Sequence, residues 1–120
     1  MENDPIIQKL QNLQSKFAKE RNWDKYHTPK NLSMALSVEV SELLEIFQWM
    51  TDNEILEKLD DKDFKDSISD EIADIFLYLI RISEKLDINI EKSVLSKLEK
   101  NEIKYPKKLS KDNAIKYNKR

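Results

Sequence analysis

The 120-residue sequence contains no glycine, and this absence constrains the fold more than any other feature. Glycine is the usual residue of tight hairpin turns, and glycine-rich loops cradle nucleotide phosphates in P-loop and Rossmann proteins. Leucine, isoleucine, lysine and glutamate are abundant instead, a composition typical of helical proteins. We therefore predict an all-α protein, a bundle of about four to five helices. Any phosphate that it binds must be held by side chains and metal.

Two pairs of acidic residues stand on the most apolar stretches of the chain. Glu39 and Glu42 form the first pair, and Glu71 and Asp74 form the second. The i, i+3 spacing places both carboxylates of a pair on one face of a helix, about one turn apart. Both stretches are rich in leucine, isoleucine, valine and phenylalanine on nearly all sides, which predicts buried helices. Buried carboxylates are costly unless they are paired or bind a metal.

The first acidic pair has no basic residue near it in the sequence. None lies between Asn31 and Thr51, and in the second stretch Arg81 stands seven residues past Asp74. Four converging carboxylates without cations indicate a divalent metal, and ligation by oxygen alone suits Mg²⁺ or Mn²⁺. The competing interpretation is that both helices are amphipathic and their acids point to solvent. Spacing alone leaves the two interpretations open.

Capping signals divide the chain into five helices. Asp4 and Pro5 suit the start of the first, and Thr51 with Glu54 forms a capping box before the short third. Thr28 or Asn31 caps the second. The expected helices span residues 4–22, 31–50, 51–59, 64–86 and 90–104, the last capped by Asn89.

The loop expected at residues 23–30 gathers Trp23, Tyr26 and His27. Aromatic rings beside the one histidine of the chain can form a base-stacking pocket, or they can cap the core. The apolar surface of these helices exceeds what five helices can bury among themselves, so we also expect an oligomer.

Length favours one domain, which we expect to span residues 1–105. Pro106 ends the last helix, and residues 106–120 form a basic tail with six basic residues and one acid. This tail is either a solvated end or a segment that reaches an anionic ligand. The absence of cysteine excludes disulfides and cysteine-based zinc sites. A polar N-terminus and the lack of a long apolar run predict a cytoplasmic protein without membrane or nucleic-acid-polymer partners.

The acidic pairs and their flanking motifs resemble the MazG-like all-α nucleoside triphosphate pyrophosphohydrolases. Glu39-x-x-Glu42, followed after 28 residues by Glu71-x-x-Asp74, is similar to the metal-binding signature of that family. Within the family, the resemblance points to the dCTP pyrophosphatase branch. It is carried by the segments 17–23, 26–32, 35–36, 45–49, 74–79, 95–97 and 104–106, together with Asn101.

This resemblance implies a role for each matching residue. Glu39, Glu42, Glu71 and Asp74 are expected to bind Mg²⁺, with Mn²⁺ as an alternative. A member of the first pair, or Glu45 one turn beyond Glu42, is expected to accept the proton of the attacking water. Substrate contacts are expected from Trp23, Tyr26, His27, Lys30, Asn31, Trp49, Tyr78, Lys97 and Asn101. In this set Trp23 and Trp49 flank the base, while Lys97 and Asn101 reach the phosphates.

The resemblance further implies that a dNTP, dCTP or a 5-modified dCTP above all, is cleaved to the monophosphate and pyrophosphate in nucleotide-pool sanitation. It implies a homotetramer built as a dimer of dimers, in which a neighbouring subunit completes each site. Gln14, where animal members carry histidine, and Lys30, in place of the usual arginine, depart from the pattern. The alternatives are a pyrophosphohydrolase with broad NTP, dUTP or phosphoribosyl-ATP specificity, and a non-enzymatic helical interaction module.

Overall fold

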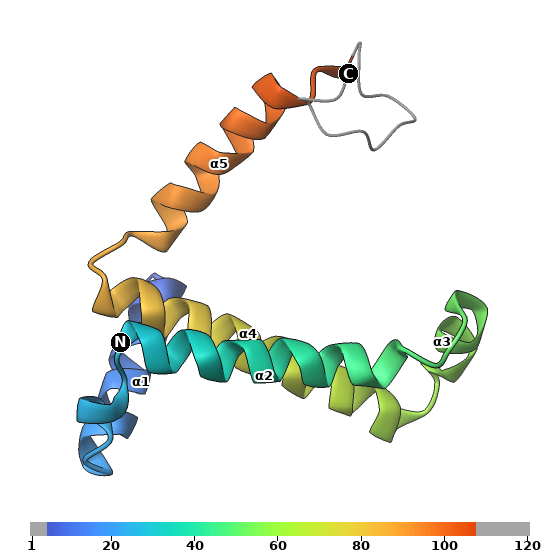
Figure 1. Ribbon diagram of the computed structural model, residues 1–120, viewed down its shortest axis with the longest axis horizontal. Helices are drawn as coiled ribbons and strands as arrows, with labels where there is room; N and C mark the ends of the chain where they lie inside the picture. Colours follow the sequence, from blue (N-terminus) through green and yellow to red (C-terminus); the bar gives the residue numbers. More distant parts are fainter. Residues whose placement is uncertain (1–4, 108–120) are drawn as a thin grey trace. The chain divides into compact units, whose positions relative to one another are not determined.

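A computed structural model describes residues 5–107, and every regular element in that range is helical (Figure 1). The elements are α1 (Ile6–Glu20), η1 (a 3₁₀-helix, Asp24–Tyr26), α2 (Pro29–Phe47), α3 (Asp52–Lys58), α4 (Lys62–Lys85) and α5 (Ile90–Lys104). The all-α prediction is therefore confirmed. The chain divides into two compact units, Met1–Asp87 and Ile88–Arg120, so that α1 to α4 belong to the first and α5 to the second.

Side-chain caps fix where the helices begin. The Thr28 hydroxyl accepts a hydrogen bond from the Asn31 backbone N–H at 3.1 Å, so α2 begins at Pro29, two residues earlier than its expected start. The capping box is present as predicted, with Thr51 and Glu54 bonded reciprocally at the start of α3. Asn89 caps α5, also as predicted. Asp4, the expected first cap, lies outside the described residues.

Two helices end on left-handed residues without the help of glycine. Asn22 follows α1 and Asp87 follows α4, and both have φ of 54°. Glycine is the usual residue in this position, and asparagine and aspartate adopt it at a lower cost than other side chains do. At these two helix ends, a chain without glycine therefore uses the next most tolerant residue types. This explains why α1 ends two residues before its expected boundary.

The first unit is built on a helical hairpin. Helices α2 and α4 pack side by side and antiparallel, α3 lies at the turn between them, and α1 packs against α4 (Figure 1). Ala18, Leu32 and Ile80 form the fully buried apolar core, one residue from each of the three packed helices. The site described below lies where these three helices meet.

The chain does not bury α2 and α4 on all sides, contrary to what their composition predicts. On α2, Val38 is 55% exposed and Leu44 is 61% exposed, and on α4, Ile72 is 54% exposed. Burial of such side chains is worth about 1.5–3 kcal/mol each, so an apolar face of this size favours association. Among the described residues, no helix is both long and apolar enough to cross a bilayer.

Candidate functional site

The hairpin brings three of the four predicted acidic residues together. Carboxylate oxygens of Glu39 and Glu42 on α2 and of Glu71 on α4 lie within 4.8 Å of one another. The Oε2 atoms of Glu39 and Glu71 are buried, and neither has a hydrogen-bond partner among the described residues. Buried oxygens without a donor are costly, and a cation between them would satisfy both. A donor set made only of carboxylate oxygens suits Mg²⁺ or Mn²⁺.

Crowding of the three carboxylates changes the acidity of one of them. The pKa of Glu71 is raised to about 7 from an ordinary value of 4.5. The main cause is a hydrogen bond that a protonated Glu71 shares with Glu39, followed by burial and by the nearby Glu42. With this pKa, Glu71 is about half protonated at neutral pH, so a cation that binds the cluster competes with a proton.

Asp74 lies one turn beyond Glu71 on α4 and is exposed. It is not part of the group within 4.8 Å, and its metal-binding role stays a prediction. Its charge nevertheless reaches the adjoining cavity, because it helps to raise the pKa of Tyr78. Burial is the main cause of that shift, and the charge of Glu39 contributes more to it than the charge of Asp74.

A cavity of about 520 Å³ adjoins the acidic cluster. This volume is within the usual range for small-molecule sites. One wall is apolar and comes from α1 and the segment after it, whereas Glu39, Asp74 and Tyr78 supply a polar end. The lining residues are Leu10, Leu13, Gln14, Phe17, Trp23, His27, Glu39, Asp74, Leu77 and Tyr78. Because Glu39 belongs to both the cluster and the cavity, a ligand in the cavity can place an anionic group beside the cluster.

Three of the predicted substrate contacts, Trp23, His27 and Tyr78, line this cavity. The Trp23 ring packs edge to face on Phe17, with centroids 5.8 Å apart, so α1 holds it in place. Trp23 is still 47% exposed, which leaves part of the indole available for stacking.

Tyr26, Lys30 and Asn31 do not line the cavity. Asn31 instead donates a side-chain hydrogen bond to the Tyr26 carbonyl at 3.0 Å, which ties the aromatic segment to the start of α2. Tyr26 and Lys30 are exposed. Their contact with substrate stays a prediction.

A single chain does not bring Trp23 and Trp49 together. Trp23 precedes α2 and Trp49 follows it, and the 19 residues of this helix span roughly 28 Å at 1.5 Å per residue. Trp49 is 87% exposed. A sandwich of one base between the two indoles therefore requires Trp49 from another subunit. Glu45 is exposed on α2 and is not part of the acidic cluster.

Lys97 and Asn101 lie four residues apart on α5, in the second unit. The pKa of Lys97 is lowered, chiefly by hydrogen bonding with Lys104, with the charge of Lys104, burial and Lys100 adding to the effect. Mutually repelling ammonium groups favour an anion beside them. Their approach to the phosphates stays a prediction, and of the basic tail only its first residues, Pro106 and Lys107, are described.

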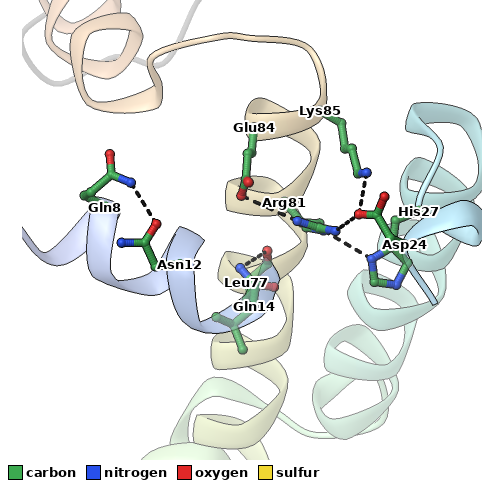
Figure 2. Close-up of polar contacts among 9 residues, drawn as sticks. All are labelled: Gln8, Asn12, Gln14, Asp24, His27, Leu77, Arg81, Glu84 and Lys85. Atoms are coloured by element: carbon green, nitrogen blue, oxygen red, sulfur yellow. Dashed lines mark hydrogen bonds and ion pairs between the residues drawn. The ribbon is translucent and has the colours of Figure 1, made fainter. Parts of the chain in front are cut away.

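The sequence interpretation named Gln14 and Arg81 but did not predict their contacts (Figure 2). Gln14 donates its amide to the Leu77 carbonyl at 3.1 Å, and so joins α1 to α4. Arg81, which the sequence placed two turns from Asp74, instead donates to His27 Nδ1 at 3.1 Å and to Asp24 at 2.6 Å. The sequence did contain one signal for these contacts. Arg81 stands between two isoleucines, and a cation on an apolar stretch needs polar partners when it is buried.

Comparison with known proteins places the chain in a family. The MazG-like family profile matches residues 34–119. The chain is 33% identical over 114 residues to dCTP pyrophosphatase 1 of Rattus norvegicus, and equally to the protein of that name of Homo sapiens. Each match covers 95% of this chain and 67% of the relative. The Bos taurus protein of the same name is 34% identical over 115 residues, covering 96% of this chain and 68% of that one.

A solved structure agrees with these relatives. The crystal structure of a pyrophosphatase from Archaeoglobus fulgidus is 42% identical, with a TM-score of 0.79 over 87% of this chain and 95% of that one. The chain therefore belongs to the MazG-like family. Two predictions from the sequence are thereby confirmed: the family, and an enzyme of the nucleoside triphosphate pyrophosphohydrolase class.

Proposed function

We propose that the protein hydrolyses dCTP or a 5-modified dCTP to the monophosphate and pyrophosphate, in a reaction that depends on Mg²⁺, as part of nucleotide-pool sanitation. One observation carries this proposal. An apolar cavity with an exposed indole is lined by Glu39, which also belongs to the cluster of three carboxylates with Glu42 and Glu71. A nucleoside triphosphate has two matching parts: a flat base, and a polyanionic triphosphate that binds divalent cations.

The acidic cluster is assigned to the phosphates. Glu39, Glu42, Glu71 and Asp74 would hold Mg²⁺, which supplies charge neutralisation at the phosphate oxygens and acidifies a nearby water. Attack of water at the α-phosphorus breaks the bond to the bridging oxygen, so pyrophosphate leaves and the monophosphate remains. A carboxylate of the first pair, or Glu45, accepts the proton of that water.

The cavity is assigned to the base. Trp23 and Phe17 supply ring surface, and stacking contributes roughly 1–3 kcal/mol per base in nucleic-acid systems. Stacking does not distinguish bases, so selection requires hydrogen bonds to the base edge. His27 and Gln14 are the polar side chains of the apolar wall that can make them.

The length of α2 supports a shared site. Since Trp23 and Trp49 flank a helix of roughly 28 Å, one subunit supplies Trp23 and another supplies Trp49. Exposed apolar side chains on α2 and α4 provide the surface for this association. We propose a homotetramer built as a dimer of dimers. Light scattering should give about four times the 14.3 kDa chain mass, and a monomer at micromolar concentration would contradict the shared site.

A nucleotide panel with pyrophosphate detection tests the substrate. We expect dCTP and 5-methyl-dCTP to have the highest kcat/KM, because a hydrophobic slot discriminates weakly against one added methyl group. Glu42→Gln and Asp74→Asn should lose most turnover while staying folded. Asp70→Asn is the matched control, because Asp70 is next to Glu71 but outside the cluster, and this variant should keep its turnover. If the kcat/KM values for all canonical dNTPs and for dUTP lie within a few-fold of each other, a broad house-cleaning pyrophosphohydrolase is the better assignment.

A further inference from the structure

Arg81 is a charged side chain buried on α4, with 2% of its surface exposed. Its guanidinium is held by groups from two segments of the chain (Figure 2). Nη2 donates to Asp24 Oδ1 at 2.6 Å, Nη1 lies 3.6 Å from Glu84 Oε2, and Nε donates to His27 Nδ1 at 3.1 Å. Lys85 shares Asp24 with it, at 2.8 Å. These contacts fix the guanidinium against one edge of the His27 ring.

The donor chemistry of arginine determines the protonation of that ring. A guanidinium carries N–H donors and no acceptor. His27 Nδ1 therefore has to accept, and it can accept only when it carries no proton. The remaining proton of the neutral imidazole then lies on Nε2.

The charges around His27 favour the same neutral form. Its pKa is lowered, first by burial and then by the charges of Arg81 and Lys85, while Asp24 acts in the opposite direction. His27 lines the 520 Å³ cavity. Nε2 has no hydrogen-bond partner among residues 5–107, so its N–H is free to donate to a ligand.

We propose that Arg81 is a positioning residue that holds His27 as an Nε2–H donor, and that this donor reads an acceptor on the edge of a pyrimidine base in the cavity. The second part rests on the function proposed above. Cytosine carries an unprotonated N3, which accepts a hydrogen bond. Uracil and thymine carry a hydrogen on N3, so a donor at this position meets a second donor and both lose their partner. The arrangement thus selects cytosine over the other pyrimidines.

The tautomer can be observed without substrate, because His27 is the one histidine of the chain. Long-range ¹H–¹⁵N correlation on the uniformly labelled full chain at pH 7.5 should show a single neutral Nε2–H form. Arg81→Met removes the donors, so the two ring ¹⁵N shifts should move toward each other as the second tautomer becomes populated. Arg81→Lys keeps a donor-only cation and should restore much of the wild-type pattern.

Two further variants separate positioning from folding. Lys85→Met removes the other partner of Asp24 but does not touch His27, and it should leave the tautomer unchanged. Asp24→Asn weakens the anchor of Arg81 at an exposed position, and it serves if Arg81→Met does not fold. In Asp24→Asn too, the two ring ¹⁵N shifts should move toward each other as the second tautomer becomes populated.

Kinetics test the reading role. The ratio of kcat/KM for dCTP to that for dUTP should fall about tenfold in His27→Ala. It should also fall in Arg81→Met, and Arg81→Lys should restore it. Lys85→Met should keep the wild-type ratio.

An Nδ1–H form, an averaged mixture or an imidazolium in the wild-type spectrum overturns the proposal. An unchanged dCTP to dUTP ratio in both His27→Ala and Arg81→Met overturns the reading role. Failure of the proposed function is a different result, an absence of pyrophosphate release by wild-type protein from any nucleotide, and the spectrum decides the tautomer independently of it.

Discussion

Binding of Mg²⁺ should displace a proton from Glu71, in an amount that depends on pH. Glu71 has a pKa of about 7 because it shares a proton with Glu39. A cation in the cluster requires the ionised carboxylate, so binding releases whatever proton Glu71 holds. For a pKa of about 7, the expected release is about 0.9 protons per site at pH 6, about 0.5 at pH 7 and about 0.1 at pH 8.

Isothermal titration calorimetry measures this release directly. The heat of Mg²⁺ binding is recorded in buffers of different ionisation enthalpy at each pH, and the slope against that enthalpy is the number of protons released. Asp70→Asn is the matched control and should give wild-type slopes. Glu71→Gln should bind more weakly and lose the pH dependence. A slope near zero at pH 6, or wild-type slopes in Glu71→Gln, would refute the shared-proton arrangement.

The same shift fixes the sign of two other pH effects. Affinity for Mg²⁺ should rise with pH and level off above pH 8, since below pH 7 a proton competes for the site. Without metal, the folded chain holds a proton that the unfolded chain releases between pH 4.5 and about 7. The contribution of Glu71 to stability is therefore lost as pH rises through that window, and Mg²⁺ should restore it.

Three further substitutions have defined outcomes. Ile80→Ala should lower the free energy of unfolding by about 2–5 kcal/mol in urea denaturation, because the side chain is fully buried, and a loss below 1 kcal/mol would contradict the assigned core. Thr51→Ala should cost about 1 kcal/mol through loss of the capping box, whereas Thr51→Ser should be close to neutral in the same assay. Trp49→Ala should raise KM without lowering the melting temperature, since the ring is 87% exposed, and an unchanged KM would remove it from the site.

Local chemistry explains which parts of the fold could be predicted from sequence. Thr51 with Glu54 and Asn89 mark helix starts through bonds to residues three positions away, so a single sequence contains the whole interaction. The i, i+3 acidic pairs are local in the same way. Convergence of the acidic pairs was one of two interpretations that their spacing left open, and the packing of α2 against α4 brings Glu39, Glu42 and Glu71 together.

Contacts between distant segments explain what was missed. Arg81 and His27 are 54 positions apart, and no periodicity relates them. Leu13 and Phe17 of α1 line the cavity, and this placement depends on how α1 packs against α4, which the spacing within α1 does not reveal. The expectation of fully buried helices failed for a related reason. Composition records how much apolar surface a helix has, whereas one chain supplies too few helices to cover it.

The central claim is hydrolysis at the α-phosphorus by a carboxylate-held metal site, and product analysis tests it most directly. Purified full-length protein is given dCTP and Mg²⁺, and nucleotide and phosphate products are quantified by ion-exchange chromatography at early times. We predict one dCMP and one pyrophosphate per dCTP consumed, with turnover abolished by excess EDTA and by Glu42→Gln. Orthophosphate and dCDP as the first products, or full turnover in EDTA, would contradict the account.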